Sequence, residues 1–291
     1  MILPFALFCQ QGYSSNFYFS QMSFFNPAYV GSSFKSEASF ISRNQWTSVE
    51  NSPQSQFLTL SSPRKNNIGL GFSAFTKKNF IERRTLTYLD FSYKLQLNDD
   101  RFIFLGLKGG VNFFKADLVS LTDQNLIIDP ALENNATFNP NIGVGFLFKS
   151  PKYYFSFSIP RIFSESNNNF QTRDALVNTF IAAGFNTVLT SNLGVESNIM
   201  FTTTKGFKNI LDFNAMIRVN DAFKIGANYR SNNTMSPLVL LNIKNFKVGY
   251  SYEFQTNNSF GSLGLKTHEL FLKIDLNYQG LDESGEQAEE D

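Results

Sequence analysis

The chain has 291 residues, enough for one large domain, and a formal net charge of +1. With one Cys and one His it has neither an intrachain disulfide nor a metal site built from Cys and His ligands. Its 34 Phe residues are typical of barrels that place aromatic rings toward lipid and at the membrane interfaces. After the first residues no apolar stretch reaches about 18 residues, which excludes transmembrane helices.

Residues 1–11 resemble the end of a secretory signal peptide. They form an apolar run that is too short to span a membrane as a helix, and polar residues follow it. We expect cleavage near Cys9 or Gln11. Acylation of Cys9, as in a lipoprotein, is the alternative, although the bulky Phe8 stands where a small residue is expected.

Residues 12–33 form an aromatic lead-in segment before the first expected strand. The stretch Asn16–Gly31 is too aromatic for a free tail, and Asn26-Pro27 and Gly31 are turn residues that predict a compact structure. Two positions remain open for this segment: a plug inside the barrel, or a place at the periplasmic rim.

Apolar and polar residues alternate with a period of two in many segments of residues 34–278. The last segment, His268–Tyr278, has an apolar face long enough for a tilted transmembrane strand of about 9–11 residues. In the segment 68–75, the small or polar residues at positions 69, 71 and 73 leave room for large side chains that point inward from neighbouring strands. The expected strands are 34–46, 55–61, 68–75, 85–97, 101–115, 137–149, 153–162, 177–189, 192–203, 209–219, 223–230, 236–243, 246–254 and 268–278.

The connections between these segments alternate between short turns and mostly longer loops. Outer-membrane barrels show this asymmetry because their periplasmic turns are short and their extracellular loops are long. A sheet in lipid must also close, since unpaired edge groups have no water to bind. We therefore predict an all-β fold, a transmembrane antiparallel up-and-down β-barrel of 14 strands, with loops 116–136 and 163–176 outside. Both chain ends, including an acidic tail at 279–291, are then periplasmic.

The charged residues of the expected strands fall on the inward-facing phase. A strong base on the lipid face would cost roughly 2–4 kcal/mol at mid-membrane, so any barrel is expected to show this phasing. The charges have mixed signs, which favours cross-strand pairing that fills the interior over a pore selective for one sign of ion. The inward charges are Glu37, Arg43, Asp90, Lys94, Lys108, Glu196, Asp212, Arg218, Lys224, Arg230, Lys247, Glu253, Glu269, Lys273 and Asp275.

The sequence offers little for catalysis or for cofactor binding. His268 is the single candidate general base, and a structural or exposed histidine is the better interpretation. The acidic residues of the loop 116–136 do not have the spacing of a calcium loop. No phosphate-binding Gly-rich loop opens a helix, and the basic pairs are too short for a nucleic-acid site. We predict no enzymatic activity, no metal, no cofactor and no nucleic-acid partner.

Several motifs together resemble the PorP/SprF family of type IX secretion membrane proteins of Bacteroidetes. The similarity covers nearly the whole chain after the signal segment. The residues that carry it are Phe19-Ser-Gln21, Asn26-Pro-Ala-Tyr29 with Gly31-Ser32, Arg43-Asn-Gln-Trp46, Ile68-Gly-Leu-Gly71, Lys247-Val-Gly-Tyr-Ser-Tyr252 and Thr267-His-Glu-Leu270.

The resemblance implies an outer-membrane barrel, in contact with outer-membrane lipid, that works with the type IX translocon. Such a barrel delivers or anchors large secreted cell-surface proteins, such as gliding adhesins, through their C-terminal sorting domains. Its outer loops would hold a cargo domain, and its periplasmic side would meet ring components. The polar lumen and the number of strands keep open a porin or ligand-specific channel as the alternative.

The opening motifs supply the candidate site residues, for which two interpretations remain open. They are either a partner-binding site or structural residues that seat the lead-in segment against the first strand, with a tryptophan at the membrane interface. These residues are Asn26, Pro27, Ala28, Tyr29, Gly31, Arg43, Asn44, Gln45 and Trp46.

Overall fold

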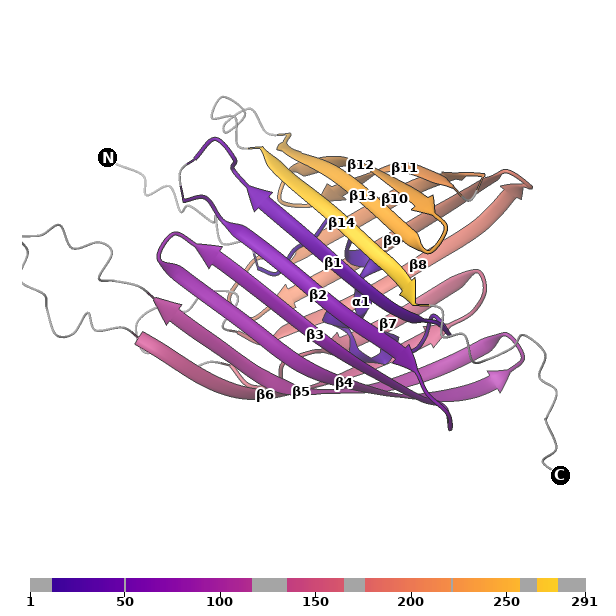
Figure 1. Cartoon of the computed structure of the whole chain (residues 1–291), viewed down its shortest axis with the longest axis horizontal. Helices are drawn as coiled ribbons and strands as arrows, with labels where there is room; N and C mark the ends of the chain where they lie inside the picture. Colours follow the sequence, from indigo (N-terminus) through magenta and orange to yellow (C-terminus); the bar gives the residue numbers. More distant parts are fainter. Residues whose placement is uncertain are drawn as a thin grey trace, which may run out of the picture.

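The computed structural model describes residues 12–49, 51–116, 135–164, 176–220, 222–256 and 266–276. Within these ranges fourteen antiparallel strands form one closed barrel, in which each strand pairs with its neighbours in sequence and β1 pairs with β14 (Figure 1). The predicted fold class is therefore confirmed. The expected signal segment and acidic tail, and most of the two long loops, lie outside the described residues. The strands are β1 Ser36–Gln45, β2 Gln54–Pro63, β3 Ile68–Asn79, β4 Glu82–Asn98, β5 Arg101–Ala116, β6 Asn135–Lys149, β7 Tyr153–Ile159, β8 Asn178–Thr190, β9 Leu193–Thr204, β10 Ile210–Val219, β11 Phe223–Arg230, β12 Thr234–Ile243, β13 Phe246–Gln255 and β14 Thr267–Leu276.

The outer surface of the barrel is an apolar belt. Alternate residues of the strands point away from the lumen, and Leu89, for example, is 71% exposed. In water such a surface would be unfavourable, whereas in a bilayer it meets hydrocarbon. None of the helices in the described ranges is long and apolar enough to cross a membrane. Large apolar side chains of this belt include Leu60, Leu70, Leu89, Leu107, Phe155, Phe213, Ile225, Leu241 and Leu270.

The two ends of the barrel differ in their connections. At one end, which we call the short-turn end, tight turns such as residues 99–100 and 191–192 join the strands, and β1 begins beside the last residue of β14. At the other end, the long-loop end, β1 is followed by residues 46–53 and β7 by residues 160–177. Residues 80–81 and 231–233 are short turns at the long-loop end, but the other connections there are longer, which agrees with the pattern expected of periplasmic turns and extracellular loops.

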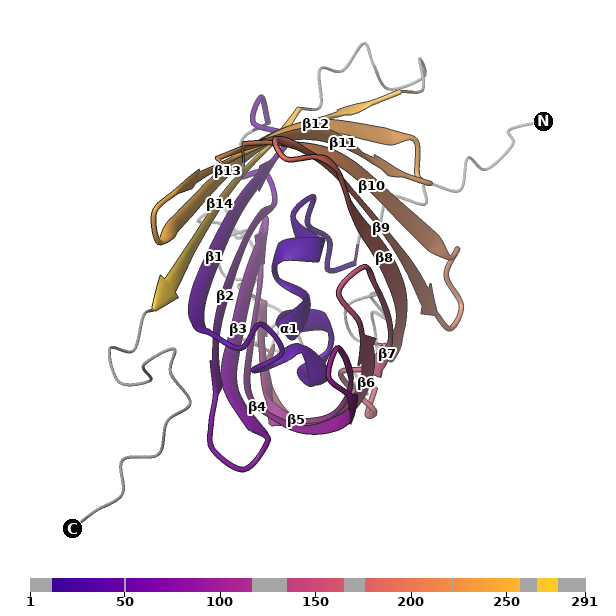
Figure 2. The same cartoon turned by 90° about the vertical axis from the view of Figure 1, so that its right-hand side faces the viewer.

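A segment of the chain occupies the interior of the barrel. Residues 13–33, which we call the plug, run through the lumen with α1, Met22–Phe25, near its middle (Figure 2). Two single-turn 3₁₀-helices, η1 at Tyr18–Ser20 and η2 at Pro27–Tyr29, flank α1. The sequence left two positions open for this segment, the interior of the barrel and the periplasmic rim. In the structure it lies in the interior.

The plug enters the lumen at the long-loop end and leaves it at the short-turn end. Gly12 and Tyr13 lie beside Asn178, the first residue of β8, and beside Asn232 in the connection that follows β11. Ser32 lies at the opposite end, where its carbonyl accepts a bond from Lys149 at the end of β6. The expectation that both chain ends lie on the side of the short turns therefore does not hold for the first described residues. The lead-in segment thus runs through the barrel once, inside the lumen, before the fourteen strands of the wall begin.

Candidate functional site

The plug contributes a cluster of buried aromatic rings to the centre of the lumen. Phe17 and Tyr18 are fully buried. The Phe17 ring stacks on Phe271 of β14 with 5.1 Å between centroids, and Phe24 meets Phe57 of β2 edge-on at 5.0 Å. Such ring pairs stabilise beyond the area that they bury. Further inward-facing apolar residues complete this cluster: Ile41, Phe75, Leu86, Tyr88, Phe180, Met200, Met216, Leu238 and Leu240.

Asn26 organises the turn through which the plug binds strands β6 and β7. Its side-chain oxygen accepts a bond from the backbone N–H of Ala28 at 2.9 Å, which caps η2, and Pro27 fits the first helical position. The Asn26 amide nitrogen donates to the carbonyls of Phe146 at 3.0 Å and Phe157 at 3.3 Å. One side chain, directly after α1, thus both caps η2 and ties the plug to two strands.

Glycines in the barrel wall provide the space for this turn. A Cβ on Gly106 of β5 would overlap the backbone of Pro27 and Ala28, and one on Gly69 of β3 would overlap the carbonyl of Val30. Gly31 has a φ of +74°, a backbone conformation that glycine adopts without strain. The room expected above the small inward residues of β3 is therefore shared: Val30 of the plug and Ser92 of β4 fill it at Gly69, and Lys108 of β5 reaches Ser73.

Replacing Asn26 with alanine tests this turn. We expect the free energy of unfolding to fall by about 1–3 kcal/mol, because the cap is lost and two buried carbonyls lose their donor. Asn44→Ala is the matched control, since Asn44 belongs to the other half of the sequence motif but is exposed. Urea-dependent unfolding in detergent micelles measures both variants. Equal losses in the two variants would contradict the structural role of Asn26.

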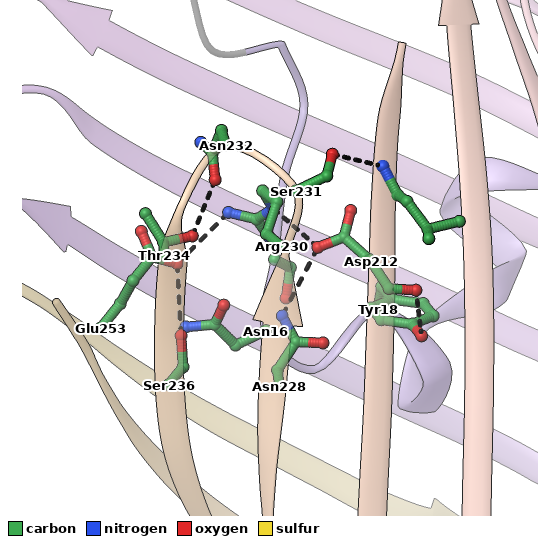
Figure 3. A network of polar contacts seen from close by, with 12 residues as sticks. Asn16, Tyr18, Asp212, Asn228, Arg230, Ser231, Asn232, Thr234, Ser236 and Glu253 are labelled. Atoms are coloured by element: carbon green, nitrogen blue, oxygen red, sulfur yellow. Dashed lines mark hydrogen bonds and ion pairs between the residues drawn. The ribbon is translucent and has the colours of Figure 1, made fainter. Parts of the chain in front are cut away.

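Near the long-loop end, five charged residues form one buried ion-pair network. Arg43 of β1 bonds Glu253 of β13 at 2.6 Å and Glu269 of β14 at 2.9 Å. Arg230 of β11 bonds Asp212 of β10 at 2.6 Å and Glu253 at 3.2 Å (Figure 3). Both arginines are 1% exposed. Each planar guanidinium bridges two carboxylates, so the network links the first strand of the barrel to four of its last five strands.

The first residues of the plug bind the same network. The Ser15 hydroxyl donates to Glu269, and the backbone N–H groups of Asn16 and Phe17 lie 3.0 and 3.3 Å from the same carboxylate oxygen. The Asn16 side chain also donates to Ser251 of β13 at 3.0 Å. Glu269 therefore joins three segments that are far apart in sequence: the plug, β1 through Arg43, and β14.

Other inward charges are paired as their mixed signs suggested. Lys108 lies directly opposite Asp90 in the β4–β5 register and binds it, and Lys273 pairs with Glu37 at 2.6 Å across the β1–β14 junction. Buried charges of this kind need partners, because water is absent around them.

The short-turn end of the lumen is more open. Lys224 and Glu196 pair at 2.7 Å there with partly exposed side chains, and a cavity of about 230 Å³ remains beside Phe19 of the plug. In the described part of the lumen, solvent thus reaches the plug at Phe19, near the short-turn end, whereas Phe17, Tyr18 and Phe25 are buried. The geometry is that of a filled barrel.

The candidate site residues separate into two groups at opposite ends of the lumen. Asn26 to Gly31 pack against β4, β5 and β6 and against Pro63 and Gly69, toward the short-turn end. Arg43 belongs to the ion-pair network, Gln45 is buried, Asn44 is exposed and Trp46 is half-buried at the long-loop end. The first group therefore does not seat the lead-in against the first strand: β1 contacts the plug elsewhere, where Gln21 approaches the Ser39 carbonyl.

Sequence reasoning missed the apolar residues that face inward. In the sequence, Phe271 is the one apolar residue on the polar face of the last strand, and Ile41, Phe75 and Met216 occupy the same inward phase on other strands. In a water-filled barrel these positions would be polar. Their recurrence was the available signal that something apolar fills the lumen.

No described group of three or more His, Cys, Asp and Glu residues is arranged to hold a metal ion.

Several solved structures have a similar arrangement of strands. The outer membrane protein Omp33 of Acinetobacter baumannii aligns with a TM-score of 0.48 and 10% identity over 83% of this chain and 98% of its own. The monoaromatic hydrocarbon channel CymD aligns with a TM-score of 0.48 and 12% identity over 87% of this chain and 91% of its own. A FadL homologue of Pseudomonas aeruginosa aligns with a TM-score of 0.46 and 10% identity over 87% of this chain and 93% of its own. Likenesses this distant carry no argument about function.

No curated protein matches the sequence. The profile of the family described as type IX secretion system membrane protein PorP/SprF matches residues 7–274. Members of this family are membrane components of a secretion system, and it is not a family of enzymes. The apolar belt of the barrel agrees with a place in the outer membrane. The chain belongs to the PorP/SprF family of type IX secretion membrane proteins.

Proposed function

We propose that this protein binds large secreted cell-surface proteins through their C-terminal sorting domains and anchors them at the outer membrane or helps export them. The observation that carries the proposal is the filled lumen. Membership of the family connects the chain with secretion, and a barrel filled by its own plug offers its two end surfaces, instead of a pore, for binding partners.

The two ends are proposed to serve different partners. The long-loop end faces the outside and holds the cargo domain, and the short-turn end meets translocon or ring components in the periplasm. Asn44 and Trp46 are the motif residues within reach of a partner at the long-loop end, since both are at least partly exposed. Asn26, Pro27 and Ala28 are buried and act through the fold.

Deletion of the gene in its native host tests this function. We expect one or a few large proteins to disappear from the surface proteome, as measured by labelling intact cells with a membrane-impermeant reagent, and to return on complementation. The same proteins should co-purify with the tagged barrel from the outer membrane. A mutant with an unchanged surface proteome and slower uptake of small solutes would contradict the proposal and favour a porin.

A further inference from the structure

The contacts of the plug follow one direction along the lumen. Gly12 and Tyr13 lie at the long-loop end, beside the ends of β8, β10 and β11. Further along the chain, Phe17 meets Phe271 and Gly249 at mid-height. The last plug residues reach the short-turn end, where the Gly31 N–H donates to Ser61 at 2.9 Å.

The two ends of the described chain consequently lie on opposite sides of the barrel. β1 begins at the short-turn end, and an even number of strands returns β14 to that end, where Leu276 pairs with Ser36. A barrel without a plug would have both ends there. Here the passage through the lumen places Gly12, the first described residue, on the other side.

Contacts at the long-loop end hold the first plug residues in place. The guanidinium of Arg161 lies over the Tyr13 ring at 5.2 Å, and that ring meets Phe75 edge-on at 4.9 Å. Arg161 also donates to the Leu176 carbonyl at 3.0 Å, and it is buried. Two residues further along the chain, Ser15 binds Glu269. Tyr13 therefore lies between β3 and the segment that follows β7.

We propose that this chain crosses the outer membrane once through its own lumen before its first strand, so that Gly12 lies at the outer surface of the cell. The inference rests on the orientation given in the proposed function, with the long loops outside. It makes the residues around Gly12 part of the surface that a cargo protein meets.

The same geometry limits the ways in which the barrel can be assembled. A secreted chain arrives in the periplasm, so residues 12–33 must enter the lumen from the periplasmic side or before the barrel closes. The carboxylate that receives Ser15, Asn16 and Phe17 belongs to β14, the last strand, and is bound by Arg43 of β1. In the finished barrel Glu269 therefore holds the plug and the β1–β14 junction together.

Cysteine labelling on intact cells tests the proposal. In a Cys9→Ser background, which removes the single native cysteine, three single-cysteine variants are compared: Gly12→Cys, Lys205→Cys in the exposed connection after β9, and Asp100→Cys in the exposed turn after β4. Each variant must show the heat-dependent gel mobility of a folded barrel. A membrane-impermeant maleimide is expected to label positions 12 and 205 on intact cells and position 100 after lysis alone.

Labelling of position 205 on intact cells, with position 12 labelled after lysis together with position 100, would overturn the inference and leave the orientation standing. Labelling of position 100 on intact cells, with 12 and 205 both protected, would instead overturn the orientation in the proposed function while supporting the passage through the lumen. An epitope inserted between Gln11 and Gly12 of the otherwise unchanged chain, probed with antibody on intact cells, gives an independent readout.

Discussion

Replacing Arg43 with alanine is expected to lower the free energy of unfolding by about 3–5 kcal/mol, the usual cost of removing one partner from a buried ion pair. Arg43 is 1% exposed and bonds two carboxylates, Glu253 and Glu269. Without it, Glu253 keeps its ion pair with Arg230, whereas Glu269 loses its ion-pair partner and keeps hydrogen bonds from the plug. Urea-dependent unfolding in detergent micelles measures the loss.

Two further variants show whether the network causes this effect. Lys247→Ala removes the Lys247–Asp275 pair, which is 3.4 Å long with the lysine side chain 35% exposed, and it should cost at most about 1 kcal/mol. Arg43→Lys keeps the charge but loses the planar fork, so we expect an intermediate loss. An Arg43→Ala barrel as stable as Lys247→Ala would show that the network contributes little.

Replacing Gly106 with valine is expected to displace the plug. A Cβ at this position of β5 would overlap the backbone of Pro27 and Ala28, which has no alternative space because Asn26 ties it to β6 and β7. Overpacking of this kind costs about 1–3 kcal/mol. We expect a lower midpoint of thermal unfolding and, in the fraction that still inserts into bilayers, ion conductance that the unchanged barrel lacks.

Gly109→Val on the same strand is the matched control. Nothing in the structure lies within 4 Å of a Cβ at Gly109, and its position in the alternation points it toward lipid. Valine also has a higher strand propensity than glycine, so this variant should be as stable as the parent or more stable. If Gly106→Val matched Gly109→Val in both stability and conductance, the plug would not pack against Gly106 as it does in the structure.

The wall of the barrel was predictable from local patterns. Strands such as β4 and β14 alternate with a period of two, and turn residues such as Asn98 mark their ends, so position and direction follow from neighbouring residues alone. Closure followed as well, because a sheet in lipid has no tolerable edge. The prediction that Arg43 and Glu269 point into the lumen is confirmed as well, because it also depends only on the lipid that surrounds the barrel.

The contents of the lumen were not predictable in the same way. The partners of Asn26 are the carbonyls of Phe146 and Phe157, more than a hundred residues away, and the period of two does not say which segment an inward residue meets. The direction of the plug depends on contacts of Tyr13 and Ser15 that likewise join distant segments. Turn chemistry at Asn26 and Gly31 predicted a compact segment but not its partners.

Single-channel recording in planar bilayers tests the central claim, that the chain's own residues 13–33 fill the lumen, most directly. The purified, folded barrel is expected to insert without conducting, because Arg43, Glu269 and Arg230 are shielded from water by the plug. A stable open conductance of the unmodified protein, reproduced across insertions, would contradict the account.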